Sequence, residues 1–283
     1  MLPLKNNRRD FVKKSILGTM GGVVLAGSKL KAAPATLAKP SDLKLAFAGY
    51  TFKNFDLDET IKMIQKVDVN YLCIKDFHLP LESTDAEIAA FHKKLADANI
   101  KGYAVGPIYS KTQEALDKAF DYAKRVGVDM IVGIPRIEDL AYLDSKVKEY
   151  NIRFAIHNHG PEDKLYPNAT VIMGHIKDFD ERIGMCFDIG HNMRDGHDPV
   201  ADIKKSKRRS FDLHLKNVSK AEADGKTVEL GRGVIDIPAV VKMLAKTNYT
   251  GHLAMEYEKD MEAPMAGIAE SVGYYRGIVD TLG

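Results

Sequence analysis

The fold is decided by a short stretch of sequence, Ile183-Gly184-Met185-Cys186-Phe187-Asp188-Ile189-Gly190-His191. Its first five residues form an apolar run of the length that buried strands have, and the polar residues Asp188 and His191 follow directly. Seven further runs of this kind occur along the chain: Leu43–Ala48, Tyr71–Ile74, Gly102–Val105, Met130–Ile134, Ile152–Ile156, Phe211–Leu215 and His252–Met255. The sequence therefore predicts eight short strands, several of which end in polar residues.

Segments with helical spacing separate these runs. Apolar residues recur every three or four positions around Ile61, Ile88, Leu116 and Val240, and shorter helices are expected near Val147 and Ile176. Residues 42–283 divide into eight units of about 30 residues, the size of a βα repeat. The alternative, an open doubly wound sheet, would place a Gly-rich turn after the first strand, where Ala48-Gly49-Tyr50-Thr51-Phe52 stands. We therefore expect an α/β fold, a single (β/α)8 TIM barrel over residues 36–283.

Residues 1–35 have the composition of an export signal. The pair Arg8-Arg9 is followed by Phe11, by a small-residue apolar stretch from Ile16 to Gly27, and by the cleavage-site pattern Ala33-Pro34-Ala35. This order resembles a twin-arginine-type signal peptide. We expect the mature chain to begin near residue 36 and to lie in the periplasm without a stable membrane anchor.

Composition and charge exclude several classes of protein. Apolar residues make up 45% of the chain and charged residues 28%, which is ordinary for a globular protein, and two cysteines cannot form a disulfide framework. Without residues 1–35 the chain keeps 34 basic and 38 acidic side chains, a formal charge of −4. A mildly acidic body argues against nucleic acid as a partner, because neutralising phosphates requires clustered Lys and Arg.

Polar residues collect where the predicted strands end. The relevant stretches are Lys75-Asp76-Phe77-His78, His157-Asn158-His159-Gly160, Asp188-Ile189-Gly190-His191, His214-Leu215-Lys216-Asn217 and Glu256-Tyr257-Glu258. In a barrel of this kind the active site lies at the carboxyl ends of the strands, so these side chains are expected at one mouth.

The last four strands each offer one metal-ligand side chain. They are His157, Asp188, His214 and Glu256, and neighbouring strands lie about 4.8 Å apart, so the four can converge. Two imidazoles and two carboxylates suit one divalent metal ion, with Mn, Co, Zn or Fe favoured over Mg because nitrogen ligands disfavour a hard cation.

These motifs resemble the sugar phosphate isomerase/epimerase family, within the xylose-isomerase-like TIM barrel superfamily. The resemblance rests on Ala155–Gly160, Asp188–His191, His214–Lys216 and Met255–Glu258, and it covers about residues 42–283. It implies a divalent metal held by Glu, Asp, His and Glu from strands 5 to 8. Here His157 stands where the family usually has Glu, and Asn217 stands where an Asp usually follows the strand-7 Lys.

The reaction expected from this resemblance is proton abstraction next to a sugar carbonyl through a metal-bound enediolate. Reprotonation gives isomerisation or epimerisation, and loss of a β leaving group gives elimination. Because His157 removes one of the two carboxylates of a symmetric epimerase, we favour β-elimination of 3-keto-glycosides. The alternatives are an isomerase or epimerase of an unphosphorylated sugar, and a sugar-binding barrel without catalysis. A repair-type endonuclease of the same fold would need a basic groove and a multi-zinc cluster.

The remaining site residues are assigned by position. The predicted acid–base groups are Glu256, Lys75 and His78, and the predicted substrate contacts are His159, His191, Lys216, Glu162, Tyr50 and Arg232. The expected partner is a small carbohydrate, and the sequence leaves the oligomeric state, native metal and exact substrate open.

Overall fold

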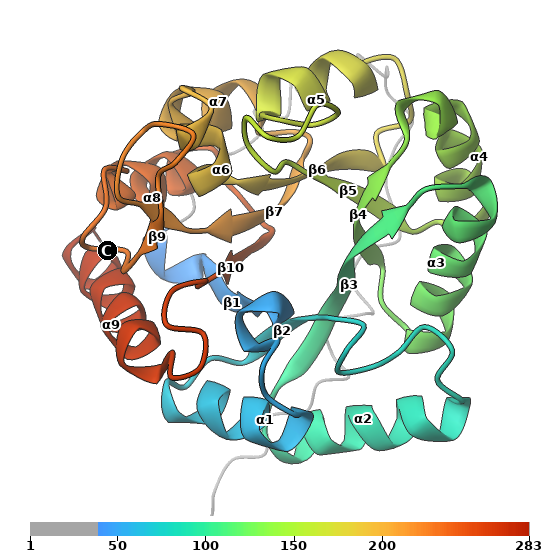
Figure 1. Cartoon of the computed structure of the whole chain (residues 1–283), viewed down its shortest axis with the longest axis horizontal. Helices are drawn as coiled ribbons and strands as arrows, with labels where there is room; N and C mark the ends of the chain where they lie inside the picture. The colour runs from blue at the N-terminus through green and yellow to red at the C-terminus, as the bar shows by residue number, and fades with distance from the viewer. Residues whose placement is uncertain (1–38, 283) are drawn as a thin grey trace, which may run out of the picture. The chain divides into compact units, whose positions relative to one another are not determined.

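Eight parallel strands close into a barrel in the computed structural model, which describes residues 39–282 (Figure 1). Around the barrel the strands follow the order β1-β10-β7-β6-β5-β4-β3-β2. Their bounds are Lys44–Ala48 (β1), Tyr71–Ile74 (β2), Lys101–Ser110 (β3), Met130–Pro135 (β4), Arg153–His157 (β5), Ile183–Asp188 (β6), Ser210–Leu215 (β7) and His252–Met255 (β10). Each run predicted to be a strand is one, and the predicted closed barrel is confirmed.

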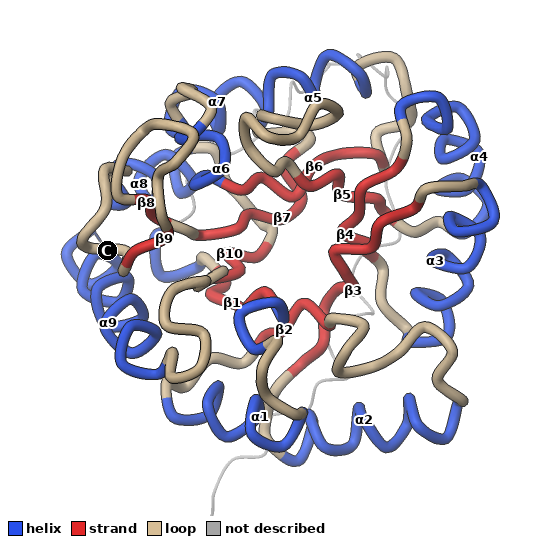
Figure 2. The backbone as a smooth tube through the Cα atoms, in the orientation of Figure 1, coloured by secondary structure: helices blue, strands red, loops and turns tan. Residues whose placement is uncertain are grey.

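Helices surround the strands on the outside, as Figure 2 shows in blue around red. Their bounds are Leu57–Lys66 (α1), Asp85–Asp97 (α2), Gln113–Val126 (α3), Leu140–Tyr150 (α4), Ala169–Ile176 (α5), Ile189–Arg194 (α6), Pro199–Ser206 (α7), Ile237–Lys246 (α8) and Met265–Leu282 (α9), with 3₁₀ turns at Pro40–Asp42, Gly49–Phe52 and Ile137–Asp139. The six predicted helical regions are all helices. No helix within residues 39–282 combines the length and apolarity that crossing a bilayer requires.

Local chemistry explains where the outer helices start. Asp56 accepts a hydrogen bond from the backbone N–H of Glu59 at the start of α1, and Thr84 does the same for Glu87 at α2. Each cap satisfies a donor that the first helical turn leaves free, and the glutamates return the bond in both cases. The apolar face of α1, including Ile64, then packs against the strands.

Two features differ from the predicted elements. Strand β3 continues five residues beyond Val105, although Pro107 cannot donate to a ladder, and this extension carries Tyr109 to the barrel mouth. The chain after β7 forms a small antiparallel hairpin from β8 (Asn217–Val218) and β9 (Thr227–Val228). The amide of Asn217 holds this loop by donating to the carbonyls of Leu230 and Ile235.

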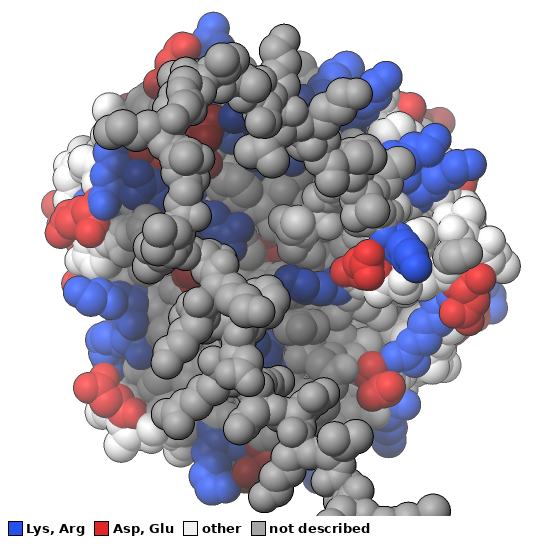
Figure 3. All heavy atoms as spheres, turned by 180° about the vertical axis from the view of Figure 1, so that it is seen from behind, with Lys and Arg blue, Asp and Glu red and all other residues white. Residues whose placement is uncertain are grey.

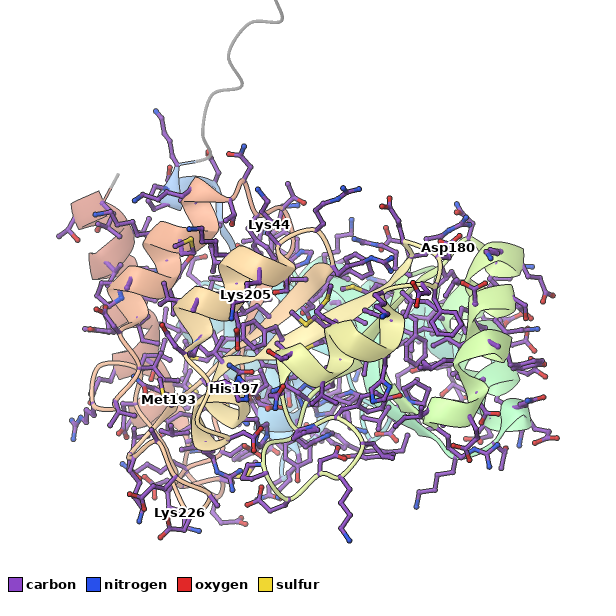
Figure 4. The ribbon with its side chains drawn as sticks, turned by 90° about the horizontal axis from the view of Figure 1, so that it is seen from above. Lys44, Asp180, Met193, His197, Lys205 and Lys226 are labelled. Atoms are coloured by element: carbon purple, nitrogen blue, oxygen red, sulfur yellow. The ribbon has the colours of Figure 1, made fainter. Side chains whose placement is uncertain are left out.

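The two ends of the barrel are distinct. In Figure 4, Lys44 at the start of β1 lies toward one edge, and Met193, His197 and Lys226, which follow β6 and β7, lie toward the other. The carboxyl ends of the strands therefore share one mouth, which faces the viewer in Figure 1. On the opposite face, Lys and Arg lie interspersed with Asp and Glu where the residues are described (Figure 3).

Residues 1–35, predicted to be an export signal, lie outside the described part of the chain.

Candidate active site

The four predicted metal ligands lie together at the carboxyl mouth. His157 ends β5, Asp188 ends β6, His214 lies near the end of β7, and Glu256 follows β10; each is at most 4% exposed. Parallel pairing sets Asp188 beside His214. The side chain of Asn158 locks the ends of β5 and β6 together, because it donates to the Asp188 carbonyl at 3.0 Å and accepts from the Asp188 N–H at 2.9 Å.

A buried ammonium group lies between the carboxylates. Lys216 Nζ is 2.7 Å from Glu256 Oε2, 3.2 Å from Asp188 Oδ2 and 2.5 Å from Glu258 Oε2. The Lys216 side chain is only 1% exposed. Asp188 uses its other oxygen to cap α6, accepting from the His191 N–H at 2.8 Å. Lys216 thus provides a fixed positive charge in the carboxylate cluster.

The same residues form two overlapping sets that could hold a metal ion. In one set, ligand atoms of His157, Asp188, His191 and Glu256 lie within 4.8 Å of one another. In the other, this holds for His157, Cys186 and His214. The predicted set is therefore split: His214 groups with a thiol, although its Nδ1 is also 3.2 Å from Glu256 Oε2 and 3.8 Å from Asp188 Oδ2.

The donor atoms fit a metal ion. His157 Nδ1 and His214 Nε2 are buried without a hydrogen-bond partner among the described residues. Asp188 Oδ2 and His214 Nδ1 also form no hydrogen bond of regular geometry, although each has an ion-pair neighbour at 3.2 Å. Buried polar atoms are nearly always satisfied, so several orphans around one point mark a place where a cation belongs. A divalent metal held by imidazoles with carboxylate or thiolate would satisfy them.

A pocket of about 360 Å³ opens above these residues. Its lining is Tyr50, Lys75, Pro107, Tyr109, His157, His159, His191, Glu256 and Glu258. Its volume is near the lower end for ligand pockets and suits a single sugar-sized molecule. No arginine is among the described residues that line it, so this lining offers no guanidinium group to bind a phosphate through two hydrogen bonds.

One wall of the pocket carries a chain of hydrogen-bonding groups. The Tyr109 hydroxyl lies 3.0 Å from His159 Nε2, and His159 Nδ1 lies 3.3 Å from Asp163 Oδ2. Burial, followed by the charge of Asp163, raises the pKa of Tyr109, so its phenol keeps its proton. This wall can donate a proton to a bound molecule.

Another part of the lining carries an ionised carboxylate. Burial alone would raise the pKa of Glu256, but His214 and Lys216 outweigh it and hold that pKa well below its ordinary range. Asp188 behaves alike, since Lys216 and His191 overcome the effect of burial on its pKa. Burial lowers the pKa of His191 to about 4, so its imidazole is neutral at physiological pH.

Several predicted contacts do reach the pocket. Tyr50, Lys75, His159 and His191 line it, and Lys216 lies beneath it, although its ammonium is held by carboxylates. The Lys75 ammonium pairs with Asp76 at the rim.

Three predicted site residues lie outside both the pocket lining and the buried cluster of metal-ligand and Lys216 side chains. The ring Nε2 of His78 lies 3.0 Å from the carbonyl oxygen of Phe55 and 3.1 Å from Thr60 Oγ1, so this histidine ties the loop after β2 to α1. Arg232 makes two 2.6 Å hydrogen bonds to the exposed Glu270 carboxylate on α9. Glu162 is 60% exposed and pairs with Arg194. The predicted roles of His78 and Arg232 are not supported by these positions.

Tyr109 and Glu258 line the pocket, but neither has a role assigned from the sequence. Tyr109 lies beyond Pro107, where the apolar pattern of β3 ends in sequence, so no periodic signal marks it. Glu258 is named only as part of a strand-end stretch, although its position two residues after Glu256 in extended chain places both on one side.

The chain belongs to the xylose isomerase-like TIM barrel family, whose family model matches residues 70–278. This confirms the resemblance drawn from the strand-end motifs.

Curated relatives match over part of their length. The rhizopine catabolism protein MocC of Rhizobium meliloti is 28% identical over 144 residues, which cover 44% of this chain and 42% of MocC. An inosose dehydratase of Clostridium botulinum is 34% identical over 91 residues, 27% of this chain and 30% of that protein. A second inosose dehydratase, from Lacticaseibacillus casei, is 21% identical over 60% of this chain and 70% of its own. The chain thus spans less than half the length of the first two relatives.

Solved structures show the same barrel. An uncharacterised protein from Parabacteroides distasonis is 27% identical with a TM-score of 0.66, over 83% of this chain and 99% of the other. The IolI protein with a bound zinc atom is 15% identical, with a TM-score of 0.69 over 85% and 99% of the two chains. The 3-keto-D-glucoside 4-epimerase YcjR from E. coli is 12% identical, with a TM-score of 0.67 over 83% and 99%. The family and the names of these proteins support the prediction of an enzyme that modifies sugars.

Proposed function

We propose that this chain is a metal-dependent lyase that eliminates a β substituent from a small sugar or cyclitol bearing a ketone. In this reaction a base removes the proton next to the carbonyl, the C–O bond at the β carbon breaks, and the leaving oxygen takes a proton. The products are an enone and water or an alcohol. The inosose dehydratases support this choice, because their name describes loss of water from a keto-cyclitol.

The observation that carries the proposal is the unequal pair of pocket walls. In the pocket lining, Glu256 offers an ionised carboxylate, and Tyr109 offers a protonated phenol backed by His159 and Asp163. Epimerisation of one carbon in both directions needs a group on each face that can both accept and donate a proton. Tyr109, whose pKa is raised, donates a proton more readily than its phenolate forms to accept one. One base and one proton donor instead match the needs of elimination.

Each residue of the chain has a defined task in this scheme. Glu256 accepts the proton from the carbon next to the carbonyl, and Lys216 stabilises the carboxylate before the transfer. Tyr109 gives its proton to the leaving oxygen, and His159, oriented by Asp163, positions the phenol through its ring nitrogen. After the products leave, the phenolate takes a proton from solvent and Glu256 releases the one it has accepted. A divalent metal bound at the buried histidines and acidic groups would polarise the ketone and stabilise the enediolate charge.

The substrate class follows from pocket size and charge. A pocket of about 360 Å³ with Glu256 and Glu258 in its lining disfavours a phosphorylated sugar. An unphosphorylated substrate also agrees with the periplasmic location that we propose from residues 1–35.

Paired variants test the proposal. With added Zn²⁺ or Mn²⁺ and a panel of 3-keto-glucosides and keto-cyclitols, Glu256→Gln and Tyr109→Phe should each lower kcat by about 10²–10⁴-fold, the usual contribution of a general acid or base. Tyr274→Phe, at an exposed tyrosine of α9 outside the pocket, is the matched control and should retain full turnover. Full activity of Tyr109→Phe would refute the role of the phenol, and a turnover without leaving-group release would favour the isomerase or epimerase alternative.

A further inference from the structure

We infer that the barrel holds a thiophilic metal ion, of the zinc class, between His157, Cys186 and His214, one layer below the carboxylates. Cys186 thereby becomes a metal ligand of this chain. The inference deepens the proposed function, on whose metal requirement it rests, by naming the ligand set and the kind of metal.

Strand geometry brings the three side chains together. His157 on β5 and Cys186 on β6 are direct partners in the parallel ladder. Cys186 and Asp188 are two residues apart on β6, so both point into the barrel, and Asp188 pairs with His214 of β7. One ligand atom from each of His157, Cys186 and His214 lies within 4.8 Å of the others, and all three residues are at most 2% exposed.

Unsatisfied atoms point to a ligand at this place. His214 Nε2 and His157 Nδ1 are buried without a hydrogen-bond partner among the described residues, and His214 Nδ1 has the Glu256 carboxylate beside it at 3.2 Å. In a tetrahedral zinc site, Zn–N and Zn–S bonds of about 2.1 and 2.3 Å separate the ligand atoms by roughly 3.4–3.6 Å. The three atoms here need to close by little more than an ångström to reach that spacing.

The carboxylate layer above already contains a buried cation. Lys216 places its ammonium 2.7 Å from Glu256 and 3.2 Å from Asp188, and a divalent ion bound there would have to displace this buried cation. Neither His157 nor Cys186 forms an ion pair with a lysine or arginine among residues 39–282. A metal in the His/Cys layer therefore leaves the Lys216 cluster in place.

Neighbouring carboxylates complete the arrangement. When His214 binds a metal through one nitrogen, its other ring N–H needs an acceptor, and Glu256 Oε2 lies 3.2 Å from Nδ1. Such a carboxylate orients a metal-bound imidazole and strengthens it as a ligand. Asp212, whose Oδ2 is 3.7 Å from Cys186 Sγ, can accept the thiol proton that metal binding releases.

The chemistry of the donors selects the metal. Two imidazoles and one thiolate favour Zn²⁺, or Co²⁺ as its spectroscopic substitute, over Mn²⁺ and Mg²⁺. His157 also lines the pocket, so a metal held by it lies next to the substrate space. The IolI structure, a barrel of the same fold, contains a zinc atom.

Cobalt substitution tests the inference directly. The chain, stripped with a chelator, is titrated with Co²⁺ while its near-ultraviolet spectrum is recorded, because a thiolate ligand produces an intense sulfur-to-cobalt charge-transfer band. We expect one Co²⁺ per chain with this band. In Cys186→Ser the band should vanish. The affinity for Co²⁺ should fall at least about 10-fold, because even the loss of a residue that only hydrogen-bonds to a metal ligand costs about that much. The matched control is Cys73→Ser, at the other buried free cysteine, which should keep both.

The outcomes separate this inference from the proposed function. Cobalt bound without a charge-transfer band in the wild-type chain would place the metal among the carboxylates and overturn the role of Cys186, while leaving elimination intact. A band that survives in Cys186→Ser, or disappears in Cys73→Ser, overturns it equally. Should Cys186→Ser fail to fold, the wild-type spectrum alone decides. No cobalt binding at all would refute both the ligand set and the metal requirement of the lyase.

Discussion

Replacement of Lys216 by methionine tests how the carboxylate cluster is held together. Methionine is close to lysine in length and fills the same space without the charge. It removes the ammonium that lies within 3.2 Å of three carboxylates, two of which, Asp188 and Glu256, are almost fully buried. The substitution therefore leaves buried negative charges with no lysine beside them.

The expected effect is large. Removing one partner of a buried ion pair costs about 3–5 kcal/mol, because the charge left behind is neither hydrated nor paired. For a domain of this size about 2–4 °C of melting temperature corresponds to each kcal/mol, so Lys216→Met should melt roughly 6–20 °C below the wild type. An exposed pair behaves differently: Lys93 and Asp97, both more than 60% exposed, should contribute only about 0.3–0.5 kcal/mol.

Thermal and urea unfolding in the presence of a chelator would measure this difference, with Lys93→Met as the control. The chelator prevents a metal ion from replacing the lost ammonium. Equal stability of Lys216→Met and Lys93→Met would refute the view that Lys216 is the internal cation of the site.

Three further outcomes are expected. Burial, with help from the charges of Lys44 and Arg153, lowers the pKa of His252 in the folded chain to about 4. As the pH falls from about 6.5 to about 4, His252 is protonated in the unfolded chain but not in the folded one, so the free energy of unfolding should decrease over this range. His252→Phe, which can keep the stacking on Tyr103, should flatten that slope in urea titrations at several pH values. Arg232→Ala should leave KM and kcat unchanged in the lyase assay, because its guanidinium is occupied by Glu270 outside the pocket; a raised KM would restore it as a substrate contact. Changing Arg8 and Arg9 together to Lys should leave the uncleaved precursor in the cytoplasm by fractionation and immunoblot, and unaffected processing would show that another export route is used.

The strands and their polar ends could be predicted because each depends on local sequence. A run such as Ile183–Phe187 is long enough to cross the barrel, and parallel topology then fixes which end Asp188 occupies. The same logic places His157, His214 and Glu256 at one mouth. Their convergence follows from the order of strands, which the repeat length already indicates.

Features that depend on side-chain direction could not be predicted in this way. His78 follows β2 as closely as the pocket-lining residues follow their strands, but the turn after Lys75 aims it at Phe55. Lys216 was expected to contact substrate, whereas its ammonium is enclosed by carboxylates from two other strands. Cys186 looks like a small apolar core residue in sequence, and only the register beside His157 shows that it lies among metal-ligand atoms.

Proton NMR in deuterium oxide, with the metal-loaded chain and a 3-keto-glucoside, is the most direct test of the proposed chemistry. The account predicts that the aglycone is released and an enone signal appears, at a rate that falls by about 10²–10⁴-fold in Glu256→Gln. Deuterium entering the carbon next to the ketone while the glycosidic bond stays intact would contradict it, because the enediolate would then be reprotonated instead of expelling the β substituent.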